Sequence, residues 1–149
     1  MNMLNNKIAI IDCGTNTFHL MIVEVKSSEY NIIHREKTVV KIGAGGINDK
    51  LIIPAAEQRA LVALSDFQKK IDQYNINKVF AFATSAFRNA SNGQALKEKI
   101  KQQTGININI IDGNREAELI FKGVIAGVKR NNERCLVMDI GGGSIEFII

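Results

Sequence analysis

The chain has 149 residues, of which 46% are hydrophobic, so it is long enough to bury one sizeable core. It has no apolar run of about 18 residues and too little charge and apolar length at its start for a signal peptide, so we expect a cytoplasmic protein without a membrane span. The net charge of +4 suits a polyanionic substrate, but the lack of tryptophan and of any basic block argues against a nucleic-acid-binding platform.

The first part of the chain is predicted to form three strands and a long helix. The strands, joined into an antiparallel meander, are expected over residues 7–13, 17–26 and 29–42, with turns at 14–16 and 27–28. After the glycine loop 43–46, Pro54 predicts the start of a helix that runs to about Tyr74. The apolar face of this helix, expected to pack into the core, consists of Leu61, Leu64, Phe67, Ile71 and Tyr74.

The middle of the chain alternates strands with helices. Residues 78–83 form a short apolar strand, and residues 84–88 follow as a loop or a single helical turn. A capping box over 91–94 predicts the start of a second helix, which ends at Gly105. Isoleucine alternates with asparagine over 106–111, which predicts an exposed or edge strand.

The last part of the chain is predicted to form a helix and a hairpin. Asn114 can cap the helix, which runs to about Val128. Its apolar stripe is expected to consist of Ala117, Phe121, Val124 and Val128. Two apolar runs around three glycines then predict a pair of strands over 136–149. This order of elements indicates an α/β fold, with a mixed five-stranded sheet flanked by helices.

The cysteines and histidines show no metal-binding spacing. Cys13 and Cys135 lie in strand-like apolar stretches, so we expect two small buried side chains rather than a disulfide or a reactive thiol. His19 and His34 are isolated, and each is expected to be a strand residue rather than a ligand.

Two segments share one pattern, in which an acid, glycine and a hydroxyl residue lie between apolar runs. The aligned positions are Asp12, Gly14 and Thr17 in the first segment and Asp139, Gly141 and Ser144 in the second. Glycines let backbone N–H groups approach an anion, and a carboxylate beside that anion needs a cation between them. The pattern predicts phosphate bound with a divalent metal, in a cleft between two related domains. The alternative is a pair of ordinary β-hairpins with glycine turns.

These two motifs resemble the phosphate loops of the actin, sugar-kinase and heat-shock-chaperone ATPase superfamily. Together with residues 83–88 and 113–121, they resemble the exopolyphosphatase and guanosine pentaphosphate phosphohydrolase family. The resemblance runs from about Lys7 to the last residue. It implies a ribonuclease-H-like domain over 1–120, followed by a connecting helix and the first hairpin of a second, truncated domain over 121–149. We therefore expect a fragment without full activity, from a protein that can form a homodimer.

The resemblance also implies roles for individual residues. Glu116 would be the general base that activates water, and Arg88 would be the phosphate clamp. Without the resemblance, these two would be a carboxylate at a helix N-terminus and a solvated arginine. Glu118 is the second choice for the base and is expected to face solvent. Asp12 and Asp139 would hold Mg²⁺. The residues expected to bind phosphate, besides Arg88, are Gly14, Thr15, Asn16, Thr17, Gly141, Gly142, Gly143 and Ser144.

The leading hypothesis is a magnesium-dependent hydrolase that removes the terminal phosphate from inorganic polyphosphate or from guanosine pentaphosphate. A kinase of the same superfamily and a non-catalytic polyphosphate or nucleotide sensor are the alternatives. Departures from the family pattern are the threonines at 15 and 17, Arg115 before the expected base, and Ile145 after Ser144. The loops are still expected to bind phosphate.

Overall fold

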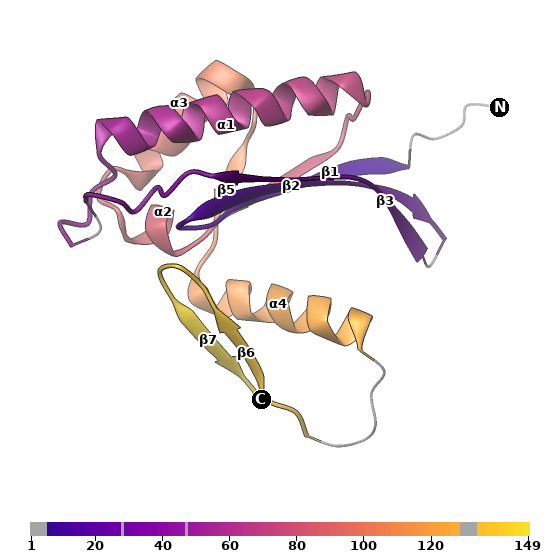
Figure 1. The fold of residues 1–149 in the computed structure, drawn as a ribbon. Helices are drawn as coiled ribbons and strands as arrows, with labels where there is room; N and C mark the ends of the chain where they lie inside the picture. The colour runs from indigo at the N-terminus through magenta and orange to yellow at the C-terminus, as the bar shows by residue number, and fades with distance from the viewer. Residues whose placement is uncertain (1–5, 28, 47, 129–133) are drawn as a thin grey trace.

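A mixed five-stranded sheet forms the centre of the molecule (Figure 1). The computed structural model describes residues 6–27, 29–46, 48–128 and 134–149. The strands of the sheet are β1 (Lys7–Cys13), β2 (Thr17–Lys26), β3 (Glu29–Val39), β4 (Val79–Ala83) and β5 (Ile108–Ile110). Their spatial order is β3-β2-β1-β4-β5; β3, β2 and β1 pair antiparallel, whereas β4 pairs parallel with both β1 and β5. The predicted meander and the predicted edge strand are therefore confirmed.

Two helices cover one face of this sheet. Helices α1 (Pro54–Gln73) and α3 (Gly93–Thr104) lie along it, whereas α4 (Gly113–Gly127) lies on the other side (Figure 1). The predicted apolar face of α1 is confirmed: Leu61, Leu64, Phe67 and Ile71 are buried, and Tyr74 packs against the core as a partly buried residue. On the side away from α1 and α3, Ile10 and Met21 are only half-buried. The sheet thus has one closed face and one open face.

The end of β3 differs from the predicted boundary because the chain leaves β2 at that point. The N–H groups of Val40 and Lys41 both donate to Asn16 O, over 3.0 and 2.9 Å, and the N–H of Ile42 donates to Thr15 O over 2.9 Å. These bonds attach the segment after β3 to the turn between β1 and β2. The predicted turn between β2 and β3 contains Ser28, which lies outside the described residues.

The predicted capping box of α3 is wrong. Asn92 is the residue before the helix, but its side chain makes no capping bond; its Oδ1 instead accepts from Ile52 N over 2.9 Å. Ser91 Oγ donates to Lys50 O over 3.1 Å. Both side chains therefore fix the loop that precedes α1. The end of α3 is as predicted, since Gly105 has a φ of 78° and closes the helix with a bond to Lys101 O.

The predicted cap of α4 is also wrong. Asp112, rather than Asn114, precedes the helix in an extended conformation, and its carboxylate accepts from Arg115 N over 2.8 Å. The predicted stripe is partly buried at three positions and exposed at the fourth, in the order Ala117, Phe121, Val124 and Val128. This burial is incomplete because α4 packs on the small hairpin that follows it rather than on the main sheet.

The hairpin after α4 is a separate two-stranded sheet of β6 (Val137–Ile140) and β7 (Ile145–Ile148). Its half-buried face carries Asp139 and Glu146. Its other face is apolar and exposed, with Met138, Ile140, Ile145 and Phe147. Cys135 lies just before β6 and is exposed, so its predicted burial is wrong, whereas Cys13 is buried as predicted. Burial, followed by the charge of Asp12, raises the pKa of the Cys13 thiol well above its usual range.

A short helix, α2 (Ser85–Asn89), follows β4, as the helical alternative for this segment predicted. Phe87, at its centre, is buried in the main core. No helix in the described ranges is long and apolar enough to cross a membrane.

The junction between α2 and α3 allows a stability test. A Cβ at Gly93 would lie 2.1 Å from Phe87 O, whereas nothing lies within 4 Å of a Cβ at Gly123 in α4. We expect Gly93→Ala to lower the free energy of unfolding by about 1–3 kcal/mol, because the backbone must move. The control Gly123→Ala should raise it by up to about 1 kcal/mol through helix propensity. Urea unfolding measures both, and a Gly93→Ala chain as stable as the unmodified chain would contradict the contact.

Candidate functional site

Both glycine motifs form tight hairpin turns that are closed by the same backbone hydrogen bond. Gly14 N–H donates to Thr17 O over 3.1 Å, and Gly141 N–H donates to Ser144 O over 3.0 Å. The sequence repeat is therefore also a repeat of backbone geometry. Because hairpins with glycine turns are common, the location of these two turns must decide between the functional interpretation and the structural alternative.

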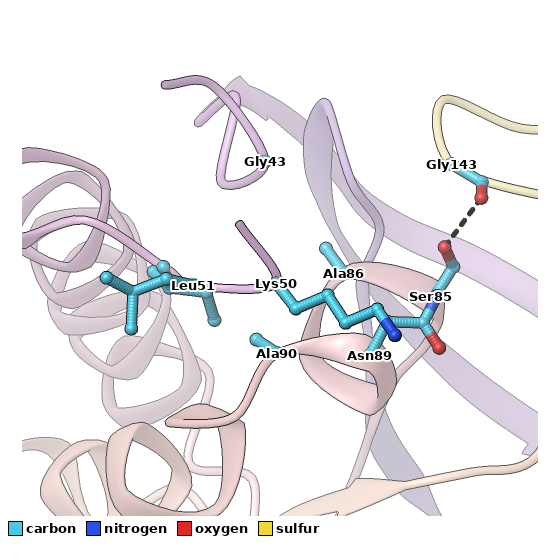
Figure 2. Close-up of a pocket in the computed structure, with 9 residues that line it drawn as sticks. Gly43, Lys50, Leu51, Ser85, Ala86, Asn89, Ala90 and Gly143 are labelled. Carbon is cyan, nitrogen blue, oxygen red and sulfur yellow. Dashed lines mark hydrogen bonds between the residues drawn. The ribbon is translucent and has the colours of Figure 1, made fainter. Parts of the chain in front are cut away.

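The two turns lie against each other. A Cβ on Gly142 would lie 2.4 Å from Asn16 Nδ2, and one on Gly143 would lie 2.5 Å from Thr15 Oγ1 and 2.6 Å from Ser85 Oγ. Ser85 Oγ donates to Gly143 O over 2.8 Å (Figure 2). Only glycine permits such an approach. We call this contact between the two turns the loop junction.

The loop junction gathers backbone donors. In the part of the chain that the structure describes, the N–H groups of Thr15, Asn16, Gly142 and Gly143 make no hydrogen bond. Gly14 and Gly141, by contrast, already use their N–H groups to close the turns. Successive free N–H groups in a turn are the feature that binds anions in proteins. Four of the predicted phosphate-binding residues thus have a free backbone donor.

Helix α2 brings the predicted base and the predicted clamp together. Arg88 Nη1 donates to Glu116 Oε2 and to Ile111 O, each over 2.9 Å. The Arg88 side chain is 24% exposed and that of Glu116 is 12% exposed. Arg88 Nε and Nη2 have no partner among the described residues, and Glu116 Oε1 has none either. Each side chain therefore uses one of its polar atoms in this pairing and keeps another polar atom without a partner.

Three carboxylates lie near enough to affect one another. The pKa of Asp12 is raised, first because its carboxylate is desolvated and further because Glu116 and Asp139 are negatively charged; nearby His19 opposes this change. As a residue, Asp12 is exposed on the open face of the sheet, so its carboxylate is only partly desolvated. Negative charges that gather in this way favour a bound cation.

Glu146 is a candidate that the sequence analysis missed. It lies directly opposite Asp139 across the β6–β7 hairpin, and its Oε2 atom is buried without a hydrogen-bond partner in the described chain. A buried carboxylate oxygen without a partner is costly, and a cation, a proton or an ordered water can compensate it. A turn of two residues between Gly141 and Ser144 places residues 139 and 146 opposite each other, and this spacing was the available signal.

The carboxylates suit magnesium better than a metal that needs a complete protein cage. No three His, Cys, Asp or Glu side chains among the described residues are arranged to hold a metal by themselves. Mg²⁺ prefers oxygen ligands and commonly uses one or two carboxylates together with water and substrate phosphate. Asp12, Asp139 and the unpaired Glu146 offer only oxygen, so the donor set fits this ion.

Glu118, the second choice for the base, lies on the surface and is already paired with two cations. Its carboxylate accepts from Lys122 and from Arg115, each over 2.5 Å. The hydrogen bond from Lys122, followed by that from Arg115, lowers the pKa of Glu118. A carboxylate with a lowered pKa is a weak base. Arg115 therefore pairs with Glu118 rather than with Glu116, and Glu118 faces solvent as expected.

A cavity of about 220 Å³ borders the loop junction. Ser85 and Gly143 form part of its wall, and the Lys50 side chain extends across it toward Asn89 (Figure 2). The ammonium group of Lys50 has no partner among the described residues. The sequence analysis did not single out this lysine, because it lies in a loop with no motif.

Several known proteins resemble this chain in sequence. A sequence model of the Ppx/GppA phosphatase family matches residues 21–149. A bifunctional 3-dehydroquinate synthase/phosphatase of Fusobacterium nucleatum is 39% identical over an alignment that covers 95% of this chain and 22% of that protein. A guanosine-5'-triphosphate,3'-diphosphate pyrophosphatase of Aliivibrio fischeri is 36% identical, over 95% of this chain and 28% of that protein.

A solved structure shares the fold. The crystal structure of an exopolyphosphatase from Cytophaga hutchinsonii superimposes with a TM-score of 0.93 and 44% identity, over 95% of this chain and 46% of that chain. This likeness confirms the predicted α/β, actin-like fold with its mixed five-stranded sheet. The chain spans less than a third of the two curated relatives described above and less than half of this structure.

The raised pKa of Asp12 predicts a dependence of stability on pH. The folded chain binds a proton at Asp12 more readily than the unfolded chain does, so stability falls as the pH rises from the usual aspartate range through the raised pKa. Asp12→Asn removes this charge and should raise the melting temperature at neutral pH without divalent ions. The control is Asp66→Asn, on the exposed face of α1. An Asp12→Asn melting curve equal to the unmodified one at neutral pH would contradict the carboxylate group.

The loop junction predicts a second effect. Gly143→Ala places a methyl group against Thr15 and Ser85, so the two turns must separate. We expect binding of pyrophosphate, measured by calorimetry, to weaken by about tenfold or more, which corresponds to about 1.4 kcal/mol. The control Gly127→Ala has nothing within 4 Å of its new Cβ and should leave affinity unchanged. Equal affinities of both variants would show that the junction does not bind phosphate.

Proposed function

Because the chain belongs to the Ppx/GppA phosphatase family, we propose that its protein is a phosphoanhydride hydrolase that releases terminal phosphate from inorganic polyphosphate or guanosine pentaphosphate. The names of two relatives support the substrates: one is an exopolyphosphatase, and another is a guanosine-5'-triphosphate,3'-diphosphate pyrophosphatase. Both substrates end in a phosphate joined through an anhydride bond, so one site can act on either.

The observation that carries this proposal is the position of α2 between the loop junction and the predicted base Glu116. At its N-terminus, Ser85 binds Gly143 of the second turn, and near its C-terminus, Arg88 binds Glu116. A single rigid turn of helix therefore links backbone donors for a phosphate to a carboxylate that can activate water. Catalysis of phosphoryl transfer depends mainly on such positioning and on charge stabilisation.

These groups have complementary roles in the proposed hydrolysis. Glu116 Oε1, which Arg88 does not use, accepts a proton from water while the water oxygen forms a bond to the terminal phosphorus. The anhydride P–O bond breaks, and the shortened substrate leaves with the bridging oxygen. The free N–H groups of Arg88 and of the loop junction donate to the oxygens of the transferred group, where negative charge develops.

We propose Asp12 and Asp139 as the residues that would hold magnesium, together with water and substrate phosphate. Bound there, the ion would neutralise charge on the phosphate oxygens. Glu146 supports this assignment because its buried oxygen otherwise has no partner. The cytoplasmic location and the homodimer stay predictions of the sequence, as does the absence of nucleic acid and membrane partners.

The decisive variant is Glu116→Gln, which keeps the hydrogen bond from Arg88 possible but removes the base. In the protein that carries this chain, we expect kcat for phosphate release from polyphosphate and guanosine pentaphosphate to fall by roughly 10²–10⁴, with substrate binding retained. Chelation of magnesium by EDTA should also abolish release. The assay is inorganic phosphate release over time.

The matched control is Glu118→Gln, which makes the same substitution two residues further along α4. This variant should keep most activity. Full activity of Glu116→Gln would reject Glu116 as the base. If the unmodified protein releases no phosphate from either substrate but binds polyphosphate, the hydrolase proposal is wrong and the protein is a sensor.

A further inference from the structure

The open face of the main sheet contains a groove that the proposed reaction does not use. A cavity of about 430 Å³ lies across β1, β2 and β3, and its lining includes Asp12, His19, Met21, Arg35 and Lys37. We call it the sheet groove. Because Asp12 lines it, the groove includes one carboxylate of the candidate site.

Strand register places the cations of this groove in line with Asp12. Asp12 pairs with His19, and His19 pairs with Lys37, so these three residues form one row across the sheet. The next row contains Met21 and Arg35, which also pair directly. Residues directly opposite on neighbouring strands share a face of the sheet. Lys37 and Arg35 therefore lie on the same face as Asp12.

Both cations are available for an anion. Arg35 and Lys37 are exposed, and neither side chain makes an ion pair or hydrogen bond with any described residue. Glu36, between them in sequence, also lines the groove, but its carboxylate contacts His34 Nε2 at 3.2 Å and forms an ion pair with neither cation.

The groove is connected to the first turn of the loop junction through one hydrogen bond. Thr17 Oγ1 lies 3.0 Å from His19 Nε2, which connects the turn to the row that ends at Lys37. Crossing from β1 to β3 takes two strand spacings, or about 10 Å. A single phosphate is much shorter than this distance, whereas a chain of linked phosphates can extend along it from Asp12 toward Lys37.

We propose that the sheet groove binds the non-scissile phosphates of an extended inorganic polyphosphate, with Lys37 and Arg35 as its contacts. This inference rests on the proposed function, because it assumes that the terminal phosphate is bound at the loop junction. The groove suits polyphosphate better than a guanine base, since no Phe, Tyr or Trp among the described residues lines it for stacking. Lys37 and Arg35 are thus residues that determine substrate specificity.

The test compares ligands of different length by calorimetric titration of the protein with pyrophosphate and with long-chain polyphosphate. Lys37→Gln and Arg35→Gln should each weaken binding of the long chain by roughly five- to tenfold, because a charge-assisted contact is lost. Pyrophosphate, which is too short to reach β3, should bind unchanged. Lys37→Arg should restore long-chain binding. The control Lys101→Gln removes one exposed charge from α3, across the sheet, and should change neither affinity.

Three results would overturn the inference: no loss of long-chain affinity, an equal loss for pyrophosphate, or an equal loss for guanosine pentaphosphate. Thermal melts of each variant, which should match the unmodified protein, exclude unfolding as the cause. Because binding is measured without turnover, this test is separate from the Glu116→Gln assay. A protein with length-dependent binding but no phosphate release would fail only the hydrolase proposal.

Discussion

The geometry of the candidate site depends on the two polar contacts of α2. A helix of five residues does not persist alone in water, so packing must hold it in place. Phe87 supplies that packing from the main core, while Ser85 and Arg88 contact the second turn and α4. Since Arg88 and Glu116 are mostly buried, loss of one partner would leave the other charge uncompensated. The sheet, the hairpin and α4 are therefore linked through one helical turn.

Most of the fold was predictable because its elements carry local signals. Apolar runs and Gly105 located the strands, apart from the end of β3, and the end of α3. The capping box failed because Ser91 and Asn92 bond to a loop about forty residues away in sequence, which no local pattern reveals. Asp112 was missed because both it and Asn114 are residue types that cap helices, and the sequence alone does not choose between them.

The candidate site was predictable in its parts but not in its arrangement. The repeated motif predicted both turns, and the family resemblance predicted roles for Glu116 and Arg88. That these two pair directly follows only from the tertiary structure, as does the direct contact between the turns. The two hairpins also differ at one equivalent position: Asp12 is opposite His19, whereas Asp139 is opposite Glu146. This difference makes the repeat asymmetric, with a cationic groove beside one acid and a second carboxylate beside the other.

Because the two faces of the β6–β7 hairpin differ in polarity, the second turn should be sensitive to insertions and deletions. Asp139 and Glu146 alternate with exposed apolar residues along their strands, and the turn from Gly141 to Ser144 sets which residues oppose each other. Inserting or deleting one codon there would shift the register and turn one strand's side chains to the opposite face. One carboxylate would then leave the site and an apolar side chain would replace it. Changes in the length of this turn should therefore be rarer in evolution than changes of residue type within the strands.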